Sequence, residues 1–71
     1  MDAEAIIKQL KKRREQLNMS QEDVASKIDS KRQYIHGIEK SKNIGLKKLI
    51  QIAGVLNLTV TLSENITYKP D

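Results

Sequence analysis

Residues 19–40 have the sequence MSQEDVASKIDSKRQYIHGIEK, which predicts two short helices joined by a tight turn. Ser20 is followed three residues later by Asp23, and this spacing resembles the capping box that begins many helices. Val24 and Ile28 then fall on one face of the first helix, which we expect to end near Ile28.

The second helix of this stretch is expected from about Lys31 to Lys40, with Ile35 and Ile38 turned inward. Two short helices joined by a tight turn are what reading of the DNA major groove requires. One helix crosses the sugar-phosphate backbone, and the start of the next presents side chains to the base edges. The pattern therefore favours a helix-turn-helix protein.

Amphipathic helices are predicted on both sides of this pair. Before it, Ile6, Leu10, Arg14 and Leu17 follow helical spacing, and Asn18 suits a left-handed helix end. After it, a helix is expected from Leu46 to about Leu56. The apolar residues of this last helix that share the expected core face are Leu46, Leu49, Ala53 and Leu56. Its surplus apolar residues, left for the core or a partner, are Ile50, Ile52 and Val55.

The residues Leu58, Thr59, Val60, Thr61 and Leu62 alternate between apolar and β-branched polar side chains, which predicts a strand. A lone strand cannot satisfy its backbone, and no other segment is a convincing strand. We therefore expect these five residues to pair with the same segment of a second subunit in a homodimer.

The expected fold class is all-α: a compact, repressor-like domain of four to five helices, with the short C-terminal strand pairing across a dimer. The domain is expected to span residues 1–62, followed by a tail over residues 63–71. A chain of 71 residues has too little apolar surface for two cores.

Composition excludes several functions. The chain has no cysteine and one histidine, so we expect no metal site, no cofactor and no enzyme activity. It has no apolar stretch of membrane-spanning length and no signal-like start, so we expect no membrane partner and a cytoplasmic, nucleoid-associated location. The net charge of +4 favours a polyanion, here double-stranded DNA.

The ordered run over residues 19–28, continued by Arg32-Gln33-Tyr34-Ile35 and Ile38-Glu39-Lys40, resembles the XRE family of phage repressor and Cro-type regulators. The resemblance covers roughly residues 10–58. It implies a homodimeric repressor that reads a palindromic operator in the major groove.

The resemblance also implies roles for individual residues. Arg14 and Glu39 occupy the positions of an internal ion pair, and Gln21 would contact a phosphate and brace the recognition helix. The residues that would contact DNA are Gln21, Lys31, Arg32, Gln33, Tyr34, His36, Lys40, Lys42 and Asn43. Of these, Arg32 and Gln33 would reach base edges, with His36 and Tyr34 deeper along the same face.

Three positions depart from the family pattern. Asp29 stands where glycine is usual, and must adopt a left-handed conformation at some cost. Lys31 replaces a Ser or Thr cap, so we expect Ser30 to cap the helix instead. Gln33 has an alternative role, since it can complete a capping box with Ser30 and never touch a base. Gly37 replaces a longer side chain, which removes one contact with DNA.

The final strand is similar to that of HipB-type antitoxins, in which two subunits pair such strands. An alternative function is therefore an antitoxin that binds and neutralises a HipA-like toxin and also regulates its own operon. Co-purification with a larger partner would separate the two hypotheses.

Overall fold

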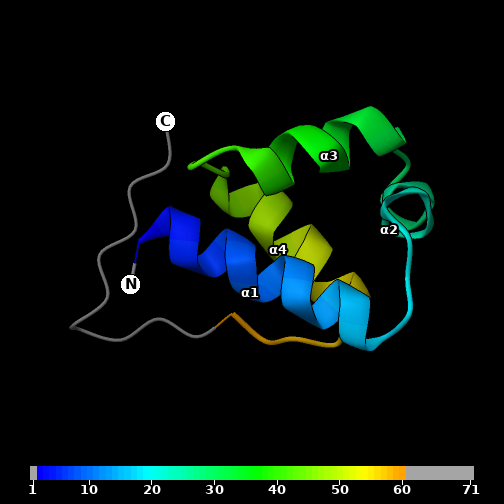
Figure 1. Ribbon diagram of the computed structural model, residues 1–71, viewed down its shortest axis with the longest axis horizontal. Coiled ribbons are helices and arrows are strands. Elements are labelled where there is room, and N and C mark those ends of the chain that lie inside the picture. The colour runs from blue at the N-terminus through cyan, green and yellow to red at the C-terminus, as the bar shows by residue number, and fades with distance from the viewer. Residues whose placement is uncertain (1, 61–71) are drawn as a thin grey trace.

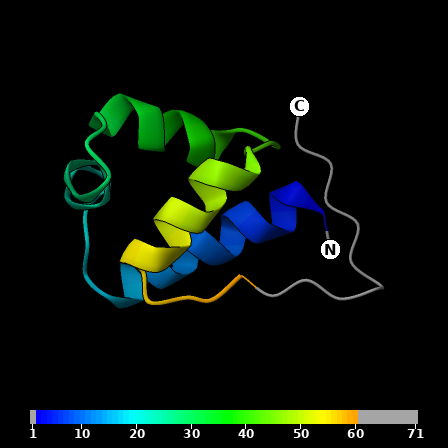
Figure 2. The ribbon, with the colours of Figure 1, turned by 180° about the vertical axis from the view of Figure 1, so that it is seen from behind.

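The computed structural model describes residues 2–60, which form an all-helical domain (Figure 1). The helices are α1 (Ala3–Gln16), α2 (Gln21–Lys27), α3 (Arg32–Lys40) and α4 (Leu46–Val55). In Figure 1, α3 runs above α4 and α1, and α2 is seen nearly end-on beside the start of α3. The reverse view in Figure 2 shows α4 in front of α1. The predicted helical domain is confirmed, and within residues 2–60 it contains no strand.

The ends of α1 and α2 follow from local sequence. The Asp2 side chain accepts a hydrogen bond of 2.8 Å from the Ala5 amide at the start of α1. Beyond α1, Asn18 has φ of 56°, which confirms the predicted left-handed stop.

The predicted capping box at α2 is also confirmed. The Asp23 amide donates to Ser20 Oγ at 3.0 Å, and the Ser20 amide donates to the Asp23 carboxylate at 2.8 Å. This backbone hydrogen bond lowers the pKa of Asp23, with the Ser20 hydroxyl contributing in the same direction. The beginning of α2 is therefore set by two residues.

The turn between α2 and α3 differs from one expectation. Asp29 adopts φ of 55°, as its place in the turn requires. The N-cap of α3 is Lys31, and no side chain caps the helix, so the prediction that Ser30 caps it is wrong. The Ser30 amide instead donates to the Ala25 carbonyl oxygen at 2.8 Å, which closes the end of α2. The alternative capping box through Gln33 is absent as well, which leaves the Gln33 side chain exposed.

The hydrophobic core draws on every helix and on the loop before α4. Its buried members are Ile7, Leu10, Val24, Ala25, Ile35, Ile44, Leu49, Ile52, Ala53 and Leu56. One expectation for α4 was wrong, because Leu46 is 41% exposed. Ile52, which was left for the core or a partner, is only 4% exposed and belongs to the core. The core face of α4 is therefore turned by part of a helical turn from the predicted one.

The predicted strand lies mostly at the limit of the described chain. Residues 58–60 form neither helix nor strand, and Thr61 and Leu62 lie outside the described residues, as does the tail over 63–71. Pairing of this segment between subunits stays a prediction, and so does the domain end at residue 62. None of the helices within residues 2–60 is long and apolar enough to cross a membrane.

Candidate nucleic-acid interface

The outer side of α3 presents an uninterrupted row of exposed polar side chains. Ile35 is buried on the opposite side, so the helix is fixed in its rotation. The predicted site residues exposed on or directly before α3 are Lys31, Arg32, Gln33, Tyr34, His36 and Lys40. These side chains share the solvent side of one short helix, as contact with base edges requires.

An internal ion pair ties α3 to α1. Arg14 Nε lies 2.7 Å from Glu39 Oε2, and Arg14 Nη2 lies 3.0 Å from Glu39 Oε1, so the pair is bidentate. Arg14 Nη1 also donates to the Met19 carbonyl oxygen at 2.8 Å, just before α2 begins. The two side chains are only 12% and 8% exposed. The pair that the family resemblance implies is thus present and shielded from solvent.

Gln21 adds α2 to the same network. Its Nε2 donates to Glu39 Oε1 at 3.0 Å, so one carboxylate receives hydrogen bonds from side chains of α1 and α2. Burial by itself raises the pKa of Glu39, but the hydrogen bonds from Arg14 and Gln21 outweigh it and hold the pKa below its usual value. The ionised Glu39 therefore holds three helices together at the end of α3.

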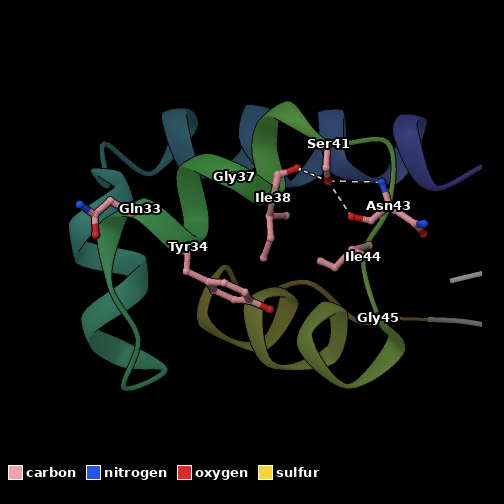
Figure 3. Close-up of a pocket in the computed structure, with 8 residues that line it drawn as sticks. All are labelled: Gln33, Tyr34, Gly37, Ile38, Ser41, Asn43, Ile44 and Gly45. Carbon is pink, nitrogen blue, oxygen red and sulfur yellow. Dashed lines mark hydrogen bonds between the residues drawn. The ribbon is translucent and has the colours of Figure 1, made fainter. Parts of the chain in front are cut away.

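The loop after α3 is ordered by Ser41. Its Oγ lies 2.9 Å from the Ile38 carbonyl oxygen and 2.7 Å from the Asn43 carbonyl oxygen, and accepts from the Asn43 amide at 3.3 Å (Figure 3). This arrangement fixes the backbone on either side of Lys42, whose side chain is exposed, while Asn43 is half-buried. The exposed polar row of α3 ends at Lys40, and Lys42 continues it on the loop.

An open hollow of about 440 Å³ lies between α3 and this loop. Figure 3 shows the Tyr34 ring leaning from α3 toward α4. The Lys48 Nζ atom sits 5.4 Å from the centre of that ring, a cation–π distance. Tyr34 and Gln33 both border the hollow, but the Tyr34 ring leans toward α4.

Gly37 forms part of this hollow, and a Cβ atom added there meets no atom within 4 Å. We expect Gly37→Ala to raise the free energy of unfolding by about 0.5–1 kcal/mol, because alanine favours the helix interior over glycine. Urea denaturation measures the change. The matched control is Gly45→Ala at the N-cap of α4, where alanine is the poorer cap, so no gain is expected. A Gly37→Ala variant that is less stable than wild type would contradict the finding that a Cβ atom has open space at this position.

Two contacts had no clear signal in the sequence. Arg13 Nε donates to the Leu56 carbonyl oxygen at 3.0 Å, which joins α1 to the end of α4. The Lys48–Tyr34 contact likewise joins residues 14 positions apart, beyond any helical periodicity. Only the buried Ile44, an isolated apolar residue in a polar loop, offered a hint that this loop packs on the core.

Within residues 2–60 no group of three or more His, Cys, Asp or Glu side chains is placed to hold a metal ion.

Four packed helices, with a short exposed helix held against a neighbour across a tight turn, define a helix-turn-helix domain. The helix-turn-helix family model matches residues 10–62, which is most of the chain, and the protein belongs to this family, of the XRE type. Comparisons with curated proteins and with solved structures gave no match. Family membership supports a DNA-binding regulator, and domains of this family are typically non-enzymatic.

Proposed function

We propose that the protein is a sequence-specific transcriptional repressor that binds a palindromic operator as a homodimer. The observation that carries this proposal is the partly buried Glu39 network, because it fixes α3 against α1 and α2 while the polar side of α3 stays exposed. A rigid helix with an outward polar row is what readout of base edges needs. A repressor of this kind acts in the cytoplasm, at the nucleoid.

In this proposal Arg32 and Gln33 contact base edges near the start of α3, where a recognition helix enters the major groove. Both side chains are exposed and neither makes a capping contact, so both are free to reach DNA. His36 lies one turn further along the same side. Arginine paired with guanine and glutamine paired with adenine are the contacts that these side chains form best.

The proposed phosphate contacts surround this row. Lys40 ends α3, Lys42 and Asn43 follow it, and Lys31 precedes it. Gln21 would donate the second N–H of its Nε2 to a phosphate while the first stays on Glu39. Contacts of this type position a protein on DNA without selecting a sequence.

We expect Lys42→Ala to weaken binding to specific and random duplexes by a similar factor. Removal of one phosphate contact should also reduce the slope of log affinity against log salt by about one unit. Fluorescence-anisotropy titrations over a range of salt concentrations measure both effects.

Lys12→Ala is the matched control for this experiment, since Lys12 is exposed on the side of α1 opposite the buried Ile7 and Leu10. It removes the same charge and should leave the slope nearly unchanged. Equal slopes for wild type and Lys42→Ala would remove Lys42 from the interface, and a wild-type protein that binds no duplex would contradict the proposed function.

The antitoxin hypothesis depends on pairing of residues 58–62 between two subunits, which residues 58–60 of a single chain do not test, and no contact within residues 2–60 favours it. We therefore place it second. It predicts a stable complex with a larger, kinase-like protein, detected by co-purification from the native host, whereas the repressor hypothesis requires DNA and a second copy only.

A further inference from the structure

One flank of α4 carries exposed apolar side chains. Leu46 is 41% exposed and Ile50 is 53% exposed, and with Tyr34 they are the large exposed hydrophobic residues of the described chain. Together with Gly54, Leu46 and Ile50 line an open groove of about 390 Å³, whose other wall is residues 58–60. Apolar surface of this kind on a small domain marks a contact with another molecule.

The spacing along this flank suits a second helix. Leu46, Ile50 and Gly54 are four residues apart, so they form one ridge along α4. Gly54 leaves a gap in the ridge, because a Cβ atom added there meets nothing within 4 Å. A helix crossing the ridge can insert a protruding side chain over Gly54.

The charges of α4 indicate what kind of helix this is. The first turn contains Lys47 and Lys48 and no acidic residue, and no side chain caps it, so the positive end of the helix dipole meets two cations. The last turn contains no basic residue, although Arg13 reaches the Leu56 carbonyl from α1. An antiparallel neighbour with this same charge pattern would relieve the mismatch, because the first turn of each helix would approach the last turn of the other.

The two lysines lie on different sides of α4. Lys48 makes its cation–π contact with Tyr34 on the side that faces α3. Lys47 lies three residues before Ile50 and seven before Gly54, which places it on the apolar flank. It forms no ion pair within residues 2–60, so it is available to a helix that covers this flank.

We propose that this flank is covered by α4 of a second copy, with the two helices antiparallel and crossing at Ile50. Two-fold symmetry then places Ile50 against its own counterpart and Leu46 over Gly54 of the partner subunit. Lys47 comes to the last turn of the other helix, which contains no basic residue of its own. This inference rests on the proposed homodimer and names its interface: the crossing of α4, rather than a ribbon of residues 58–62, holds the dimer together.

Single cysteines test the crossing, because the chain has none of its own. Ile50→Cys should give covalent dimers rapidly under mild oxidation or with a short bis-maleimide, since a residue on the two-fold axis meets its own copy. Gln51→Cys, exposed one position along, is the control and should cross-link slowly. Val60→Cys reports on an antiparallel ribbon centred at residue 60. Cross-linking at Val60 without cross-linking at Ile50 would overturn the inference.

A size exchange tests the contact over Gly54. Gly54→Leu should fill the space that the partner's Leu46 enters and weaken dimerisation roughly a hundredfold, because symmetry applies the clash twice. Adding Leu46→Ala should restore most of the loss. Sedimentation equilibrium measures the dimer constant, and circular dichroism checks that each variant folds. A wild-type protein that is monomeric at micromolar concentration, or a Gly54→Leu variant that dimerises normally, would also overturn it.

The same samples separate this inference from the proposed function. A dimer that cross-links through Ile50→Cys yet binds no DNA supports the interface and contradicts the repressor. A monomer that still selects a half-site contradicts the interface and the homodimer but supports sequence readout by α3.

Discussion

Glu39→Gln is expected to cost about 3 kcal/mol of unfolding free energy, which is most of the stability of so small a domain. The substitution leaves the Arg14 guanidinium, only 12% exposed, without its charged partner. The amide oxygen still accepts one hydrogen bond, which keeps the loss at the lower end of the range for broken buried pairs. Urea denaturation at neutral pH measures the loss.

Glu15→Gln is the matched control, because Glu15 is an exposed carboxylate on α1 and should change stability by less than about 0.5 kcal/mol. The double variant Arg14→Met with Glu39→Gln should be less destabilised than the sum of the single changes, since no charge is then left unpaired. Wild-type stability in Glu39→Gln would show that the ion pair has no structural role.

The same carboxylate predicts how stability depends on pH. The pKa of Glu39 is lower in the folded protein than in the unfolded chain, so its contribution is full above the unfolded pKa, which is about 4.3 for glutamate. The contribution is lost as the pH falls through the folded pKa. The difference in stability between wild type and Glu39→Gln should therefore shrink below about pH 4.3. A constant difference would contradict this assignment.

Arg32→Ala is expected to lose about 1–3 kcal/mol of discrimination at one base position while changing binding to random DNA far less. Arg32 is exposed at the first position of α3, and its side chain makes no ion pair or hydrogen bond within residues 2–60, so its loss leaves the fold intact. Affinities for single-base variants of the selected operator measure the effect.

Arg32→Lys serves as the control, because it keeps the charge and loses the bidentate geometry that reads guanine. It should retain random-DNA binding and lose most of the discrimination. If Arg32→Ala and Lys42→Ala weakened binding to every duplex equally, the division between base and phosphate contacts would be wrong.

Local sequence signals predicted the helix boundaries well. Ser20 and Asp23 form the expected capping box, and Asn18 has the expected left-handed conformation, because each depends on neighbours within one turn. The prediction of a Ser30 cap was wrong. The Ser30 amide donates to the Ala25 carbonyl oxygen, and this hydrogen bond depends on the conformation of the whole turn between α2 and α3.

The orientation of α4 was harder to predict. Six of its ten residues are apolar if alanine is counted, so periodicity alone fits more than one core face. Packing against the other helices buries Ile52 and leaves Leu46 exposed. The contacts at Arg13 and Tyr34 depend on the same tertiary arrangement, which no local pattern encodes.

Selection of bound sequences from a random pool of duplex DNA, with the full-length protein, tests the central claim most directly. The proposed repressor should enrich a palindrome whose half-sites lie about one helical turn apart, because two α3 helices related by a two-fold axis read successive major grooves on one side of the duplex. Enrichment of no sequence at all, with the protein folded and dimeric, would contradict the claim that α3 reads DNA.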